Sequence, residues 1–492
     1  MRGVHAHELT FEDLREEFRL PTGFPDEVEA AASAAVDRFA GERRDARDIP
    51  FVTIDPPGSR DLDQAVHVVE KDGGGWTLHY AIADVGAFVP LGSPIDLEAR
   101  KRGQTVYVPD GSVPLHPLAL SEGAASLLPD EDRPCALWTI ECGPDGVISS
   151  GTVERAVIRS TARLDYATVQ SWVDEGRELP EAVTGLKSFG EARRALAVRR
   201  GAIELELPAQ EIARGDDGRW AVRLEARTEA DAWNAECSLA TGHVAATIMM
   251  RGKAGILRTL RAATPESELE FRKAAAALGL SWPDGVAPGE FLAGLPRGDV
   301  RTLAINTAAT RLLRGADYLA FDGEAPNDAD AWHAGVGQVY AHATAPLRRL
   351  VDRFVIETCL AIEAGQEVPA ELRACYDEVR QTMNDTNRSA SAVEQAALDK
   401  GEAVVLQDRV GEAFQVAVTR AAKREGTKTR AAEVFLVEPP VFAKCEGDSP
   451  AGAVVSATLV EADPAKREVR FRAAEAAAPA VAGAPAADTP PA

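Results

Sequence analysis

The chain has 492 residues, of which 45% are hydrophobic and 27% are charged, and its formal net charge is −23. At about 150 residues per domain, this composition is typical of a globular protein of roughly three domains and excludes a fibrous or wholly disordered chain. The excess of acid opposes non-specific adhesion to nucleic acid or anionic membranes, but it leaves room for a local basic channel.

The sequence also excludes several classes of site and location. It has no apolar run of about 18 residues, and its start, MRGVHAHELTFEDLREEF, lacks the apolar core of a secretory signal. We therefore expect a cytoplasmic protein without membrane association. Its six cysteines form no C-x-x-C pair and its eight histidines form no H-x-x-x-H group. We expect small buried cysteines, and any metal should have oxygen ligands.

Residues 1–47 are charged and predict a helical extension, which ends near Pro50. From Phe51 onward, β-branched and aromatic residues surround a D-G-G-G turn at residues 72–75, which predicts an antiparallel meander. Further strands are predicted near residues 104–109, 136–142 and 147–160. After about residue 180 the periodicity favours helices, at residues 191–202, 229–250, 300–315, 346–363 and 367–404.

Residues 405–472 return to five short strands, which predict a small barrel of the OB type. Residues 473–492 are rich in Ala and Pro and predict a disordered tail. The fold class is therefore α+β. A large domain with mixed or antiparallel sheets and packed helices spans residues 48–404, and a small C-terminal OB-type β-barrel follows it.

The segment PFVTIDPPGSRDLDQA, residues 50–65, carries Asp55, Asp61 and Asp63 around a Pro-Pro-Gly turn. In extended chain, residues two apart face the same side, so Asp61 and Asp63 project together, and the turn can return Asp55 to them. Such carboxylates repel unless a cation joins them, and Mg²⁺ or Mn²⁺ suits oxygen ligands. Paired cations of this kind hydrolyse phosphodiesters through an activated water. A solvated Asp-rich turn is the alternative.

A second constellation, YAHATAPLRRLVDR, occupies residues 340–353. It gathers Arg348, Arg349 and Arg353 at the start of a helix that Pro346 is expected to open. Arginine forks and helix N-termini both bind phosphate. Surface ion pairs with Asp352 and other acids are the alternative.

These blocks, together with YAIADVGAFVPLGSPIDLEARKRGQTVYVP and VPLHPLALSEGAASLLPDEDRP, resemble the RNB catalytic domain of ribonuclease II and ribonuclease R. The resemblance runs from residue 48 to about residue 400. It implies a processive 3′ to 5′ exoribonuclease in which Asp55, Asp61 and Asp63 bind metal and act in catalysis, with Asp63 the most critical. It also implies that Arg348 steadies the scissile phosphate.

The resemblance further implies RNA contacts. Tyr107 and Tyr166 match tyrosines that pack against the terminal nucleotides, and Glu236 matches a glutamate on the last ribose, a contact that distinguishes RNA from DNA. Ordinary packing, or charge at a helix N-terminus, is the alternative for all three. Arg349, as part of the arginine block, is expected to bind the RNA. Glu394 matches a further supporting acid of the family, on a weaker alignment.

The sequence departs from the family at three places. Gln64 replaces a fourth aspartate, so a neutral oxygen would take part in the metal site and weaken a second metal. Leu205 replaces a phenylalanine of the aromatic clamp, which would loosen the grip on the strand end. The 47 residues before the catalytic domain are too few for the family's N-terminal cold-shock domains, so we expect a short form.

The predicted barrel includes RAAKREGTKTR, the densest basic stretch of the chain. A barrel with such a stretch suits single-stranded RNA, whereas a charged hairpin in solvent is the alternative. The residues predicted to bind RNA there are Lys423, Arg424, Lys428 and Arg430.

Together these features predict a Mg²⁺-dependent exoribonuclease that releases nucleoside 5′-monophosphates from single-stranded RNA. The sequence does not fix the oligomeric state, and a monomer is favoured. Two alternatives stay open: an RNA-binding protein of the same fold with little or no turnover, and a phosphodiesterase for short oligonucleotides.

Overall fold

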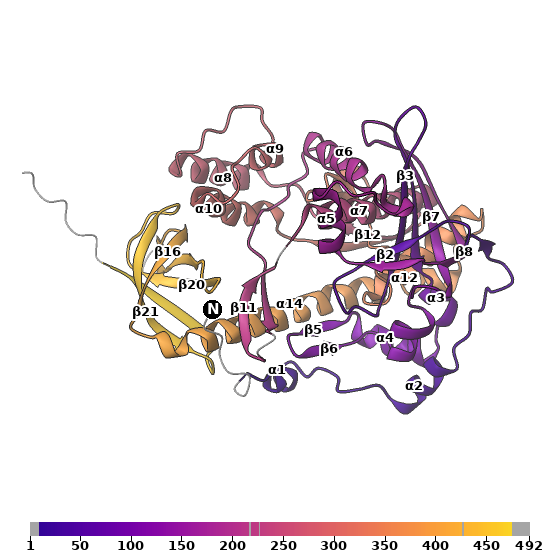
Figure 1. Cartoon of the computed structure of the whole chain (residues 1–492), viewed down its shortest axis with the longest axis horizontal. Helices are drawn as coiled ribbons and strands as arrows, with labels where there is room; N and C mark the ends of the chain where they lie inside the picture. Colours follow the sequence, from indigo (N-terminus) through magenta and orange to yellow (C-terminus); the bar gives the residue numbers. More distant parts are fainter. Residues whose placement is uncertain (1–8, 216–217, 226, 426–427, 475–492) are drawn as a thin grey trace, which may run out of the picture.

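The computed structural model describes residues 9–215, 218–225, 227–425 and 428–474. Figure 1 shows a large body of sheet and helices at one end and a small barrel at the other, with the long helix α14 (Tyr376–Leu406) running between them. This arrangement confirms the predicted α+β class and the order of the two parts.

The segment before the main sheet is less helical than predicted. Within residues 9–47 the structure has α1 (Glu12–Glu17), α2 (Asp26–Ser33) and the short β1 (Arg44–Asp45). Leu9, Phe11 and Leu14 are buried in a cluster with Val393 of α14. Neither helix has a side-chain N-cap hydrogen bond. The segment is therefore stabilised mainly by this packing against α14. Residues 1–8 lie outside the described part.

The large body is built on a sheet of seven strands among the described residues, in the order β1-β8-β7-β4-β3-β2-β9. Its further strands are β2 (Val52–Ile54), β3 (Gln64–Glu70), β4 (Trp76–Ala83), β7 (Asp132–Cys142), β8 (Ile148–Arg159) and β9 (Ala162–Leu164). The predicted meander is confirmed, because β3 and β4 pair antiparallel from Gln64↔Ile82 to Glu70↔Trp76. The edge strands β1 and β9 pair parallel, which makes the sheet mixed.

Helices α7 (Glu229–Gly252) and α12 (Leu350–Glu363) pack on the core of this sheet. A capping box between Thr228 and Asp231 starts α7. The predicted start of α12 at Pro346 is wrong, because residues 346–348 form a turn and Arg349 makes an isolated bridge with Gln104. The other helices around the core are α3 (Val85–Phe88), α4 (Pro94–Arg102), α5 (Tyr166–Asp174), α6 (Leu186–Arg199) and α13 (Ala370–Arg373).

The strand predicted near residues 104–109 is confirmed as β5 (Val106–Val108), which forms a hairpin with β6 (Gly111–Val113). Three further strand pairs were not foreseen from the sequence. They are the hairpins β10 (Gln210–Arg214) with β11 (Trp220–Leu224) and β14 (Trp332–His333) with β15 (Gln338–Val339), and the pair of β12 (Ala254–Thr259) with the distant β13 (Asp317–Asp322). The helices α8 (Pro265–Ala277), α9 (Pro288–Ala293) and α10 (Val300–Ala309) form a satellite around Phe271 and Phe291. The short α11 (Asp328–Ala331) precedes β14.

The predicted OB-type barrel is confirmed as a closed barrel of the described strands, in the order β16-β19-β20-β22-β21. These strands are β16 (Ala413–Arg420), β19 (Ala432–Leu436), β20 (Val441–Glu446), β21 (Val454–Asp463) and β22 (Glu468–Ala473). A separate hairpin, β17 (Lys423–Glu425) with β18 (Lys428–Arg430), leaves the barrel between β16 and β19. The predicted tail lies outside the described residues from residue 475 onward.

Two further expectations can be compared with the structure. All six cysteines are described and free, and all except the half-buried Cys375 are buried, as predicted. In the described ranges, we find no helix that combines the length and the apolar character needed to span a membrane.

Candidate active site

A cavity of about 1520 Å³ lies between the main sheet, α7, α10 and the barrel. At one end its wall contains Asp55, Asp61, Asp63 and Arg348. Phe435 of the barrel and Thr302 of α10 also line it, so both parts of the chain contribute to the cavity. The two constellations predicted from the sequence, at residues 50–65 and 340–353, therefore meet in one place.

Asp63 forms the buried floor of this end, because only 5% of its surface is exposed. Its Oδ1 accepts a hydrogen bond of 2.8 Å from the backbone N–H of Leu347, and its Oδ2 lies 3.8 Å from Nε of Arg348. Burial raises the pKa of Asp63 well above its ordinary value, and the Arg348 charge opposes that rise. Asp63 thus needs a positive partner to remain ionised.

Asp55 follows β2, and its Oδ2 is buried without a hydrogen-bond partner. Burial, and then the charge of Asp61, raises the pKa of Asp55 to about 7. A buried carboxylate oxygen without a partner, next to further carboxylates, fits a hard cation as ligand.

The three aspartate side chains do not form a preformed coordination site, however. Among the described residues, no three His, Cys, Asp or Glu side chains are grouped so that they could hold one ion. Joint metal binding by Asp55, Asp61 and Asp63 therefore stays a prediction, although all three line the same cavity. Mg²⁺ is commonly bound through one or two carboxylates, with waters and substrate phosphates completing its shell, so the donor set still fits such an ion.

Gln64 does not offer the oxygen that the prediction assigned to a metal. Its Nε2 donates to the carbonyl oxygen of Thr344 at 2.7 Å. Its Oε1 accepts from the hydroxyls of Tyr80 and of Ser238, the latter at 3.3 Å. An amide oxygen has two lone pairs, and both are in use here. This arrangement contradicts the prediction that Gln64 is a metal ligand.

The arginine block divides into one cavity residue and two structural ones. Arg348 is about half-exposed and lines the cavity. Arg349, predicted to bind RNA, instead makes two hydrogen bonds to Asp352, at 2.7 and 2.9 Å, and does not line the cavity. Arg353 is buried and donates to the carbonyl oxygen of Val89. Local ion pairing, the alternative considered for the block, therefore describes Arg349.

The two predicted nucleotide-packing tyrosines both line the cavity. Tyr107, on β5, is 53% exposed, and Arg348 opposes the rise that burial causes in its pKa. The hydroxyl of Tyr166 accepts a hydrogen bond of 3.4 Å from Nδ2 of Asn234, and burial raises its pKa to about 12. Leu205 also lines the cavity. These positions are compatible with base contacts, which remain a prediction.

The structure does not support the predicted roles of Glu236 and Glu394. Glu236 is buried, its Oε2 lies 3.6 Å from Nε of the buried Arg193, and it does not line the cavity. The α7 residues that line the cavity include Asn234 and Ser238, whereas Glu236 faces Arg193. Glu394 is exposed on α14 and also does not line the cavity. Asn234 and Ser238 were missed because helix orientation depends on packing.

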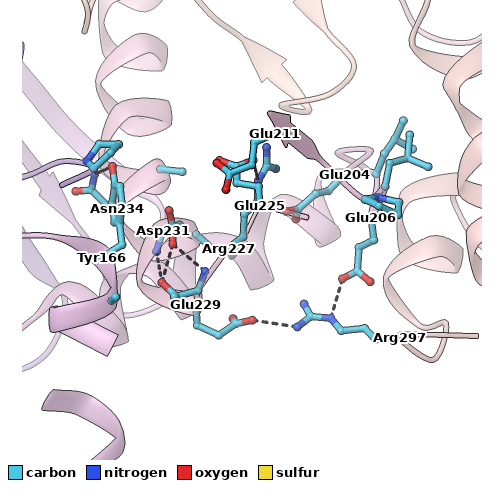
Figure 2. A pocket seen from close by; sticks show the side chains of 18 of the residues that line it. Tyr166, Glu204, Glu206, Glu211, Glu225, Arg227, Glu229, Asp231, Asn234 and Arg297 are labelled. Carbon is cyan, nitrogen blue, oxygen red and sulfur yellow. Dashed lines mark hydrogen bonds and ion pairs between the residues drawn. The ribbon is translucent and has the colours of Figure 1, made fainter. Parts of the chain in front are cut away.

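The other end of the cavity is acidic, which the sequence analysis did not foresee. Figure 2 shows Arg297 between two glutamates. Its Nε lies 2.8 Å from Glu206 and its Nη1 lies 3.0 Å from Glu229, which also pairs with Arg194 at 2.7 Å. The remaining acids labelled there are Glu204, Glu211, Glu225 and Asp231. Arg297 thus ties the segment that carries Leu205 to the start of α7.

The basic stretch of the barrel forms the β17–β18 hairpin, in which Lys423 pairs with Arg430 and Arg424 with Thr429. Arg430 is exposed, and the side chains of Arg424 and Lys428 lie outside what the structure describes. Burial, followed by the charges of Arg430, Arg311 and Arg314, lowers the pKa of Arg420 to about 10. Positive charge from the barrel and from the end of α10 is therefore concentrated in one region.

Comparison with known families agrees with this arrangement. The family model described as the RNB domain matches residues 43–361, and the model described as the RNase II-type exonuclease C-terminal S1 domain matches residues 412–474. The first match covers more than half of the chain, so the protein belongs to the RNB domain family. The second match coincides with the closed barrel.

Individual relatives support the same assignment. Ribonuclease R of Escherichia coli is 30% identical over 426 residues, which cover 80% of this chain and 51% of that protein. The chain thus spans about half the length of that relative. Mycoplasma genitalium RNase R matches with a TM-score of 0.83 alone and 0.80 in complex with ribose-methylated single-stranded RNA. In both cases the identity is 20%, and the match covers 94% of this chain and 77% of that one. Yeast Ssd1, described as a pseudonuclease, matches with a TM-score of 0.65 at 16% identity, over 88% of this chain and 53% of that one.

Proposed function

We propose that this protein is a Mg²⁺-dependent exoribonuclease that hydrolyses single-stranded RNA from its 3′ end and releases nucleoside 5′-monophosphates. The observation that carries the proposal is the contact of Asp63 with the Leu347–Arg348 turn, in a cavity that also contains Asp55 and Asp61. Membership of the RNB family and the likeness to ribonuclease R support it. The cytoplasmic location and the monomeric state stay predictions.

The side chains divide the chemical work as follows. Asp55, Asp61 and Asp63 would hold Mg²⁺ or Mn²⁺, which supplies an activated water and neutralises charge when it is bound. Arg348 is exposed to the cavity and can form a bidentate contact with the scissile phosphate. The planar, charged guanidinium can keep this contact while negative charge develops on the phosphate.

The tyrosines and the barrel would guide the strand. Tyr107 and Tyr166 provide aromatic surfaces for bases next to the aspartates. Residues at the start of α10 line the cavity, and the helix leads toward Arg311 and Arg314, close to Arg420 and Arg430. We expect the RNA outside the cavity to follow this basic region, because phosphate contacts need clustered positive charge.

The test uses a 5′-labelled oligoribonucleotide with either a free or a blocked 3′ end, in Mg²⁺ and in EDTA. We expect a ladder that shortens from the 3′ end, with 5′-mononucleotides as product, only for the unblocked RNA in Mg²⁺. Equal decay of both substrates, or internal cleavage, would refute the exonuclease direction.

Two observations favour a second candidate, an RNA-binding protein without turnover. Gln64 gives no carboxylate to the site, and a protein described as a pseudonuclease shares the fold. In that case wild type and Asp63→Asn would bind the oligonucleotide equally and release no mononucleotide. RNA of graded length, with matched DNA, would reveal the third candidate, a phosphodiesterase restricted to short oligonucleotides.

A further inference from the structure

The turn that carries Arg348 is held at three points by groups from other parts of the site. The carbonyl oxygen of Thr344 accepts from Gln64 at 2.7 Å, and the N–H of Ala345 donates to Oδ1 of Asp352 at 2.7 Å. The N–H of Leu347 donates to Asp63 at 2.8 Å. Two of these three hydrogen bonds involve consecutive residues, Asp63 and Gln64. Together they fix both the distance and the orientation of the turn relative to β3.

The side chain of Gln64 is itself fixed by hydrogen bonds on the side away from Thr344. The hydroxyls of Tyr80 on β4 and Ser238 on α7 both donate to its Oε1, and these two hydroxyls lie 3.0 Å apart. Tyr80 is 1% exposed, so this support is rigid and shielded from water. The network joins two strands, one helix and the arginine turn.

Only an amide satisfies both sides of this network. Its oxygen accepts from the two hydroxyls while its NH₂ donates to the carbonyl oxygen of Thr344. An ionised carboxylate at the same place could accept from the two hydroxyls. It could not donate a hydrogen bond to the Thr344 carbonyl oxygen, so two acceptors would face each other. The position of the amide therefore explains why a glutamine stands beside the aspartates.

We propose that Gln64 is a positioning residue that holds the Thr344–Arg348 turn, and with it the Arg348 guanidinium, in register with Asp63. This inference rests on the proposed function, because its effect on catalysis acts through Arg348. Misplacement of a catalytic group by about 1 Å can cost about a hundredfold in rate, so a small shift of the turn is sufficient.

The sharpest test compares Gln64→Glu with Gln64→Met. Neither substitution has the amide donor, but glutamate adds a carboxylate and methionine keeps the length without a polar group. If Gln64 positions the turn, both variants lower kcat by about tenfold to a hundredfold, with KM little changed. Mg²⁺ affinity, measured by calorimetry on the RNA-free protein, then stays within about twofold of wild type. Tighter Mg²⁺ binding by Gln64→Glu with kcat retained would instead make residue 64 a metal ligand and overturn the proposal.

A second measurement does not depend on activity. Hydrogen exchange of the peptide spanning residues 343–350 should become faster in both variants, because the Thr344 anchor is lost. Gln381→Glu, the same chemical change at an exposed position of α14, is the matched control and should alter nothing. Unchanged exchange in the Gln64 variants would overturn the inference. A wild type that lacks exonuclease activity would refute the proposed function only, and exchange would still decide the role of Gln64.

Discussion

Glu402 offers a quantitative test of how the barrel is joined to the rest of the protein. It lies on α14 with 4% of its surface exposed. Its Oε1 accepts from Nε2 of Gln210 on β10 at 2.6 Å and from the backbone N–H of Phe442 on β20 at 3.0 Å. One carboxyl oxygen therefore links the helix, the β10–β11 hairpin and the barrel.

Burial raises the pKa of Glu402 to about 7 in the folded protein, from its ordinary value of 4.5. The folded state thus binds this proton more tightly than the unfolded state. The resulting stability is fully present below pH 4.5 and is lost as the pH rises through about 7. At 1.36 kcal/mol per pKa unit, the loss amounts to about 3 kcal/mol.

The perturbation is Glu402→Gln. Both hydrogen bonds converge on one oxygen, which an amide oxygen can replace, while the ionisable group disappears. We expect the variant to match wild type within about 1 kcal/mol at pH 5. We expect it to be more stable by about 3 kcal/mol at pH 8.5.

The assay is urea unfolding of both proteins at pH values from 5 to 8.5. Glu394→Gln, on an exposed face of the same helix, removes the same charge and should track wild type throughout. A stability difference between Glu402→Gln and wild type that does not vary with pH would refute the reasoning. It would show that Glu402 is ionised in the folded state over the whole range.

Three further predictions concern the cavity. Asp63→Asn should lower mononucleotide release by at least about a hundredfold, with RNA binding by fluorescence anisotropy retained; appreciable turnover would exclude Asp63 from the chemistry. Mg²⁺ affinity of the RNA-free protein, measured by calorimetry, should rise about tenfold from pH 6 to 8, because Asp55, with a pKa of about 7, must lose its proton to bind the ion. A flat profile would contradict that assignment. Leu205→Phe should tighten binding of the RNA 3′ end by about fivefold to a hundredfold through stacking, and equal affinities would place residue 205 away from the bases.

Much of the fold follows from local pattern. The alternation around the turn at residues 72–75 predicted the β3–β4 pairing, and the five short strands after residue 405 predicted the closed barrel. Both signals are alternations of apolar and polar residues, because side chains two residues apart in a strand face the same side. Such an alternation can be read from a few consecutive residues. The hairpin β10–β11 gave no such signal, because its burial pattern is mixed and its place depends on α14 and the barrel.

The same division applies to the cavity. The spacing of Asp55, Asp61 and Asp63 was enough to predict that they act together, and all three line one wall. The orientation of Glu236 was not predictable, because packing against other elements decides which residues of a helix face the cavity. Glu236 instead lies 3.6 Å from the buried Arg193. Likewise, Arg349 takes part in a bridge with Gln104, far away in the chain, and α12 therefore begins later than Pro346 would suggest.

The sequence by itself determined the family, the main strands of the sheet and barrel, and the chemical identity of the aspartate and arginine segments. Tertiary structure decided which of these residues reach the cavity, that Gln64 is engaged by Thr344, Tyr80 and Ser238, and that a share of the acid behind the net charge of −23 lines the cavity. The physical reason is one of range. Side-chain periodicity acts between near neighbours in the chain, whereas a hydrogen bond such as that from Gln64 to Thr344 joins residues 280 positions apart and exists only when the whole core has packed.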